Sequence, residues 1–406
     1  MKHVWFITAV VFFYGLGNGV LLNATPQAVL HLQLSSSQLG LIGMGIPLGY
    51  ALSCVLCGQL FAGVVGKRVL MAGTAIAICA SLVMAQARTA SACVAAQLVF
   101  GVASGAFWPF ASAWLLDFQA EGISKTRLLR HYNASWTPAT AFGMLLSGQL
   151  CERGWIFDAF YVGAGLLAMA FVLASIPKAT QPGQSFESSP GETAGATRGE
   201  RLGLAIVLAG ALANLVALGA RGIVINNFAE LNRFIGGGAQ RMGLIAAASL
   251  ASQFVMFSIG GYYERWLGLR RIYFVMAGGL CVVNLGFAYA TSTPLLIASA
   301  ALHGAVLALA FQTGIIAAIR HFSSPRIGTT FHEAIVGLGG TAPIVAGVLV
   351  TVLRHSGAEE HAALRAPFLL FLCLTVLVLA VQLCLIATRT HQRTLLPSEG
   401  CKQAGV

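Results

Sequence analysis

The loop Gly58-Gln-Leu-Phe-Ala-Gly-Val-Val-Gly66-Lys67-Arg68 has a counterpart 202 residues later, Gly260-Gly-Tyr-Tyr-Glu-Arg-Trp-Leu-Gly268-Leu-Arg270-Arg271. In both loops a Gly at the end of one apolar segment precedes, by eight positions, a Gly that opens a basic turn. A second echo has an offset of 199 residues and pairs Arg127…Tyr132…Gly148 with Arg326…Phe331…Gly347. This pattern predicts a duplicated protein that crosses a membrane many times, and duplicated halves are typical of secondary transporters.

The composition predicts that lipid covers most of the surface. Hydrophobic residues make up 57% of the chain and charged residues 9%, with a mean hydropathy of +0.80, whereas soluble domains are about a quarter charged. The net charge of +11 comes from Lys and Arg in short loops between apolar runs, a membrane-orientation signal that argues against nucleic-acid binding. The nine cysteines suggest no disulfide framework, and Cys54-x-x-Cys57 lies in an apolar run, so it is interpreted as packing.

Apolar runs long enough to cross a bilayer, about 20 residues each, occur twelve times. The first six lie at roughly 4–30, 38–63, 68–87, 90–116, 130–151 and 156–176, and the second six at roughly 203–229, 241–263, 271–290, 294–319, 328–353 and 366–387. Residues 177–201 are rich in Pro, Gly, Ser, Thr and Glu and predict a flexible linker. We therefore expect an all-α membrane protein with a six-helix bundle at 1–176, a linker at 177–201, a second bundle at 202–388 and a tail at 389–406.

The basic residues predict the orientation in the membrane. Of the 24 Lys and Arg, seventeen fall in the N-terminus and in alternate connections after it, six fall on the other side, and Arg221 lies within an apolar run. This asymmetry predicts that both termini and the linker are cytoplasmic. We expect a multi-pass protein of a bacterial plasma or inner membrane.

These motifs resemble those of the major facilitator superfamily, whose second helix is followed by G-x-L-a-D-R-x-G-R-[RK]. Gly58, Leu60 and Gly66-Lys67-Arg68 match in kind, but the first loop is one residue longer and lacks the acidic residue. The second copy restores the acid–base pair as Glu264-Arg265. The resemblance implies two six-helix bundles that rock about a central cavity, and it implies that Glu264 and Arg265 help to close the cytoplasmic side. The fourth helix departs from the family because Gln97, not Arg, precedes Gly101.

Arg221 is the basic residue deepest inside an expected span. An Arg facing a central cavity would bind the anionic group of a solute through its planar fork. Alternatively the helix sits lower and the side chain extends to the outer headgroups. Counting from Arg201 favours the headgroups, and alignment of the repeats, which sets Arg221 against Gly19, favours the cavity.

Other ionisable residues are candidates for coupling or gating. His303 lies near mid-bilayer and could carry a proton, or it could be a neutral packing residue; Gln312, nine positions on, faces the opposite way on the helix. Glu333 begins the eleventh helix, where we expect a cytoplasmic gate with Arg127 or Arg130 as its partner. The mirror-related pair is Asp117 with Arg326, and the alternative for Asp117 is an ordinary loop charge.

Polar and aromatic residues recur at helical spacing on three spans and predict the walls of the cavity. The alternative is interhelical hydrogen bonding and close packing, but the bulk of two tryptophans favours a cavity. The candidate substrate-binding residues are Arg221, Asn18, Asn23, Gln27, Trp108, Asn133, Trp136 and Gln312.

The sequence thus predicts a secondary active transporter of a small neutral or anionic solute, working by alternating access, with protons as a candidate coupling ion. Alternatives are a drug or lipid exporter of the same fold, or a non-transporting sensor or scaffold. No G-x-x-x-x-G-K-[ST] loop occurs, and no clustered catalytic or metal-ligating residues fall at mid-bilayer. We therefore expect no enzymatic activity, cofactor or metal, and a monomer whose partners are the lipid bilayer and the solute.

Overall fold

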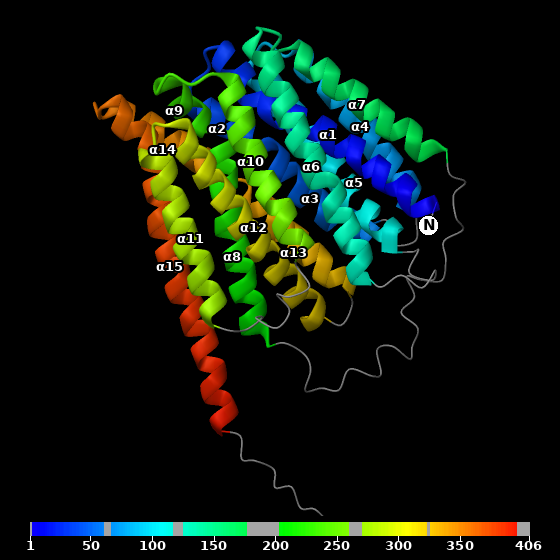
Figure 1. The fold of residues 1–406 in the computed structure, drawn as a ribbon, viewed down its shortest axis with the longest axis vertical. Helices are drawn as coiled ribbons and strands as arrows, with labels where there is room; N and C mark the ends of the chain where they lie inside the picture. Colours follow the sequence, from blue (N-terminus) through cyan, green and yellow to red (C-terminus); the bar gives the residue numbers. More distant parts are fainter. Residues whose placement is uncertain are drawn as a thin grey trace, which may run out of the picture.

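The computed structural model describes residues 2–60, 66–116, 125–176, 203–259, 270–322 and 325–395. The regular structure in these ranges is helical throughout (Figure 1). The helices are α1 (Lys2–His31), α2 (Ser36–Gly43), α3 (Gly45–Leu60), α4 (Gly66–Gln86), α5 (Ala90–Leu116), α6 (Lys125–Glu152), α7 (Asp158–Ser175), α8 (Leu204–Ile225), α9 (Phe228–Phe234), α10 (Ala239–Ser258), α11 (Arg270–Tyr289), α12 (Thr293–His321), α13 (Pro325–Gly339), α14 (Pro343–His355) and α15 (Glu360–Leu395).

Eleven stretches of these helices are long and apolar enough to cross a membrane. The twelfth crossing is α6, whose 28 residues extend about 42 Å. Its sequence is less apolar because it carries cavity-facing polar residues, including Asn133. The prediction of a twelve-helix membrane fold is therefore confirmed. Twelve crossings return the chain to the face where α1 begins, called here the terminal face, and the other side is called the opposite face.

Two of the twelve crossings are each built from two helices. The second crossing consists of α2 and α3, which meet at Met44, and the eleventh consists of α13 and α14, separated by residues 340–342. Pro343 begins α14; its ring fixes the backbone and removes a hydrogen-bond donor, which favours a break before it. The two broken crossings lie side by side, with α2 against α14 and α3 against α13.

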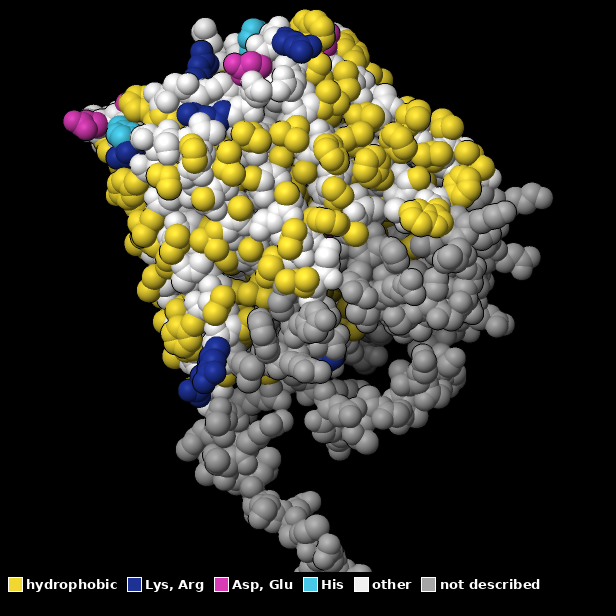
Figure 2. All heavy atoms as spheres, in the orientation of Figure 1, with side chains coloured by type: hydrophobic (Ala, Val, Ile, Leu, Met, Phe, Trp, Pro, Cys, Tyr) yellow, Lys and Arg dark blue, Asp and Glu magenta, His cyan; other side chains and the backbone are white. Residues whose placement is uncertain are grey.

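Each half of the chain has its own apolar core. One core joins buried residues of α1 to α7, such as Tyr14 and Phe100, and the other joins those of α8 to α15, such as Tyr273 and Phe287. The halves also meet where α6 packs on α10. On the side of the molecule shown in Figure 2, hydrophobic side chains cover the middle, and most of the charged side chains in view gather at the upper edge, which is the opposite face. The hydrophobic middle is the part of the surface that a bilayer covers.

Glycines set the distance between helices within the first half. A Cβ added at Gly143 of α6 would meet the carbonyl oxygen of Leu16 and lie 3.0 Å from Cα of Gly19, both on α1. Only residues without a side chain allow such close backbone contact.

The predicted linker at 177–201 lies outside the described residues, so the domain boundaries remain a proposal.

Candidate functional site

A cavity of about 220 Å³ lies between the two halves of the bundle. Its wall is formed by α1, α2, α3, α5 and α6 from the first half and by α8, α10, α12 and α13 from the second. The lining combines carboxamides, aromatic rings and two side chains of opposite charge, Arg221 and Glu333. Since both halves supply the wall, a solute in this cavity would contact both.

Arg221 lies in the last turns of α8 and lines the cavity. Its side chain is half-buried, and among the described residues none accepts a hydrogen bond from it or forms an ion pair with it. The structure therefore places this side chain at the cavity, as the repeat alignment predicts. A guanidinium without an acceptor in an apolar wall is a favourable site for an anion, because its fork binds planar oxyanions through two hydrogen bonds.

Glu333 also lines the cavity, from α13. Its Oε2 accepts a hydrogen bond of 2.6 Å from the hydroxyl of Tyr50 on α3, so this bond joins the two halves. The sequence predicts a more peripheral gate position, with Arg127 or Arg130 as the partner. Among the described residues the partner of Glu333 is Tyr50, and the side chains of Arg127 and Arg130 lie outside the described residues.

Five aromatic rings form a continuous series in which Trp108, Trp136 and Phe311 line the cavity and Phe257 and His332 are buried behind it. The Trp108 and Trp136 rings lie 5.9 Å apart, and Trp136 lies 6.1 Å from Phe257. The series continues to Phe311 at 5.8 Å and then to His332 at 4.5 Å. Trp108 and Trp136 belong to the first half and the other three to the second. Flat faces of this kind bind unsaturated rings by stacking or edge contacts.

Carboxamides supply most of the remaining polar lining. Asn18 and Asn133 face the cavity, as predicted, and Asn133 accepts a hydrogen bond from the Trp136 indole nitrogen at 3.1 Å. Gln97, which stands where the family carries Arg, donates to Thr25 Oγ1 at 2.9 Å. The first half therefore presents neutral donors and acceptors to the cavity.

Four predicted residues do not line the cavity. Asn23 donates to Ser147 at 3.5 Å between α1 and α6, which is the interhelical bonding considered as the alternative. His303 is buried, with Nδ1 3.4 Å from Ser249 Oγ and Nε2 3.3 Å from the Ala217 carbonyl oxygen. The other two are Gln27 and Gln312, which are half-buried.

Several predicted gating residues cannot be placed. Asp117, Glu264 and Arg265 lie outside the described residues, as do the side chains of Arg127 and Arg326. Their assignment to a cytoplasmic gate remains a prediction.

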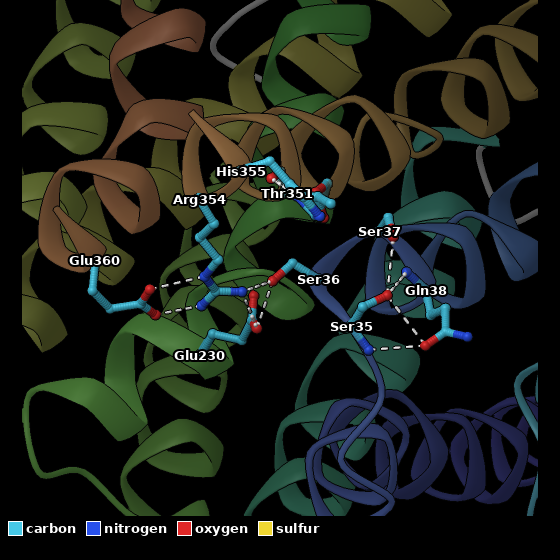
Figure 3. A network of polar contacts seen from close by, with 10 residues as sticks. Ser35, Ser36, Ser37, Gln38, Glu230, Thr351, Arg354, His355 and Glu360 are labelled. Atoms are coloured by element: carbon cyan, nitrogen blue, oxygen red, sulfur yellow. Dashed lines mark hydrogen bonds and ion pairs between the residues drawn. The ribbon is translucent and has the colours of Figure 1, made fainter. Parts of the chain in front are cut away.

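A polar network joins the two halves at the opposite face (Figure 3). The Ser36 hydroxyl of α2 donates to Glu230 Oε1 at 2.7 Å and accepts from Arg354 Nη1. Arg354 of α14 lies 3.4 Å from Glu230 of α9 and forms a two-bond ion pair with Glu360 of α15. Ser36 is the member of this network from the first half, so this buried hydroxyl connects the halves.

A second contact between the halves on this face lies at the other side of the bundle. Glu152 Oε2, at the end of α6, accepts from the Gln240 backbone nitrogen at the start of α10 at 3.0 Å. The N-terminal turn of a helix favours a carboxylate there. Polar contacts therefore close the opposite face on both sides.

Several of these residues were not predicted from the sequence. Tyr50, Phe311 and Gln253 line the cavity, and Ser36 and Arg354 join the halves. Tyr50 and Gln253 are polar residues inside apolar spans, and this placement is a sequence signal for a cavity-lining position. Ser36 and Arg354 lie just outside the predicted spans at 38–63 and 328–353, and no pattern in the sequence pairs them.

The comparisons with known proteins agree with this architecture. Residues 7–210 match the model of the Major Facilitator Superfamily. No curated protein matches the sequence. The nucleoside transporter NupG superposes with a TM-score of 0.73 at 16% identity, covering 95% of this chain and 99% of that chain. PepTSo2 gives 0.68 at 14% identity, covering 97% and 98%. A bacterial homologue of the human lysosomal transporter Spinster, inward-facing and unoccupied, gives 0.64 at 15% identity, covering 96% and 97%.

These findings establish the class of the protein: a helical membrane protein with a transporter fold. The chain belongs to the major facilitator superfamily. The resemblance found in the loop motifs is thereby confirmed.

Proposed function

We propose that this protein is a secondary active transporter that moves a small neutral or anionic solute by alternating access, with an organic anion as the favoured cargo. The observation that carries this proposal is Arg221, a cation in the cavity wall that no acceptor among the described side chains satisfies. An uncompensated charge in a low-dielectric wall is costly. A bound anion would offset that cost, whereas a cationic solute would increase it.

The closure of the opposite face supports alternating access. Ser36 connects the halves there by hydrogen bonds to charged groups, and these bonds must break if that face is to open. The bonds thus bias the protein toward the state in which they exist. Energy would come from an ion gradient, and Glu333 is the candidate proton carrier because it lies in the cavity. We propose a bacterial inner membrane with cytoplasmic termini.

The test combines ligand-dependent thermal stability with transport. Purified protein is heated with matched sets of neutral, anionic and cationic solutes, and each stabilising solute is then tested for uptake into proteoliposomes. We expect organic acids to stabilise the protein and to be taken up. In Arg221→Lys, acid affinity should fall at least about tenfold, because an ammonium cannot form the two parallel bonds.

The control is Arg270→Lys, the same chemical change at an exposed position at the start of α11, which should leave affinity unchanged. Unchanged acid affinity in Arg221→Lys would refute the anion assignment. Stabilisation without any uptake would favour a sensor or scaffold, and stabilisation confined to lipids or hydrophobic cations would favour an exporter of those compounds.

A further inference from the structure

The cavity holds two charges of opposite sign that are not paired with each other. Arg221 has no acceptor, and Glu333 has the Tyr50 hydroxyl on Oε2 and no cation within ion-pair distance among the described residues. In most protein interiors such charges pair, because isolated charges in a medium of low dielectric constant are unfavourable. Here both project into one cavity and remain apart.

Their separation follows from the packing of α8 on the eleventh crossing. A Cβ at Gly222, next to Arg221, would lie 3.1 Å from the Gly340 carbonyl oxygen. Gly222 and Gly340 therefore lie at the same depth along the bundle. Glu333 precedes Gly340 by seven residues, which is about 10 Å along a helix. The cation therefore lies toward the opposite face and the carboxylate toward the terminal face, about one small organic molecule apart.

The flat surface comes from the other half of the protein. Trp108 and Trp136 line the same cavity from α5 and α6, whereas both charges are on α8 and α13. A molecule whose ends bind the charges and whose flat part contacts the tryptophans would therefore touch both halves. A solute that bridges the halves can act on the equilibrium between their arrangements.

We propose that the cargo is amphoteric: a small molecule with an anionic group at one end, an ammonium or similar cationic donor at the other, and an unsaturated ring between them. The anion binds Arg221, the ring contacts Trp108 and Trp136, and the cation binds Glu333. This inference rests on the proposed function, since it uses the same cavity and the same anion site. It adds the second charge and the ring as determinants of specificity.

Three probes of nearly equal shape separate these contributions. They are 4-(aminomethyl)benzoate, with both charges; 4-methylbenzoate, with the anion alone; and 4-methylbenzylamine, with the cation alone. Binding to the full-length protein is measured by thermal stabilisation and by quenching of tryptophan fluorescence. We expect 4-(aminomethyl)benzoate to bind at least about tenfold more tightly than 4-methylbenzoate, and the amine to bind least, because Arg221 repels it.

The variants assign the preference to a residue. Glu333→Gln retains an acceptor for Tyr50 but removes the charge, so it should abolish the advantage of the aminomethyl acid over 4-methylbenzoate. Glu359→Gln makes the same change at an exposed position before α15 and should keep the advantage. Arg221→Lys should weaken both acids.

Each result has a distinct consequence. Equal affinity for the two acids, an advantage that survives in Glu333→Gln, or no binding of any probe would overturn the amphoteric proposal. If 4-methylbenzoate binds and depends on Arg221 while the amino group adds nothing, the anion transporter stands and only this inference fails. If Arg221→Lys leaves both acids unaffected, the anion assignment itself fails.

Discussion

Ser36→Ala is the smallest change that should open the opposite face. The Ser36 side chain is buried and bonds to both Glu230 and Arg354 of the other half. Alanine removes both bonds, while Arg354 keeps its contacts with Glu230 and Glu360. The substitution therefore removes the bonds that Ser36 makes between the halves, while the Glu152–Gln240 contact and the ion pairs of the second half remain.

The size of the effect follows from the type of bond. Hydrogen bonds to charged groups contribute about 1.5–3 kcal/mol each. The two bonds share one hydroxyl, and the charged groups still satisfy each other, so we take about 2 kcal/mol for the pair. That energy corresponds to about a 30-fold change in the ratio of closed to open protein.

Distances between spin labels across the opposite face measure this ratio. Labels replace Arg153, after α6, and Glu359, before α15; both positions are exposed. The background is a cysteine-free variant, and we expect Ser36→Ala to populate longer distances than the parent. Ser37→Ala is the matched control, because the Ser37 hydroxyl bonds to Ser35 within the first half. If Ser36→Ala and Ser37→Ala gave the same distance distribution, the assignment of this network as a gate would be wrong.

Three other predictions follow from the structure. A reporter active only in the periplasm should stay silent when fused after Arg393, and activity would contradict cytoplasmic termini. Gly143→Ala should lower the apparent melting temperature, by overpacking worth about 1–3 kcal/mol. Gly165→Ala should not, because nothing lies within 4 Å of the added Cβ; equal melting of both would refute the close-packing argument. At saturating solute, uptake by Glu333→Gln should lose its dependence on an imposed pH gradient, whereas uptake by His303→Gln should keep it. The reverse result would identify His303, and not Glu333, as the residue that carries the coupled proton.

The spans were predictable because the bilayer sets the length of each apolar run, so that counting runs of that length gives their number. Every predicted span has a helical counterpart among the described residues. The breaks in the second and eleventh crossings were harder to predict from the sequence. Pro343 begins α14 directly after a break, and Pro47 stands three residues after the break at Met44, where its ring crowds the Gly43 carbonyl group. Other prolines that are equally visible in the sequence, Pro26, Pro109 and Pro138, lie inside continuous helices. Neighbouring helices decide which proline interrupts a helix in a membrane.

The direction that a side chain faces was harder to predict than its depth. An error of two residues in a helix boundary rotates a side chain by about 200° around the helix. For Arg221 the depth was open as well, because counting from Arg201 and aligning the repeats gave two different levels in the membrane. The polar stripe on α6 shows the same limit: Asn133 and Trp136 line the cavity, but Gly143 and Ser147 pack on α1. Only the neighbours of the helix distinguish the two ends of one stripe.

The polar contacts between the halves depend on tertiary structure entirely. Ser36 and Arg354 are separated by 318 residues and Tyr50 and Glu333 by 283. No local pattern marks a serine as the partner of an arginine so distant in the chain.

The two pairs share one arrangement that bears on alternating access. Ser36 and Tyr50 lie on the broken second crossing, and Arg354 and Glu333 lie on the broken eleventh. In each crossing the break falls between the two polar residues, at Met44 in one and at residues 340–342 in the other. An unbroken helix would couple its ends rigidly, whereas a break allows the segment at the opposite face to move relative to the segment at the cavity. A transporter must open one face while the other stays closed, so contacts that can break separately suit it better than contacts on rigid rods. The breaks thus place Glu333, which lines the cavity, and Ser36, which bonds the halves at the opposite face, on adjoining segments of the same two crossings.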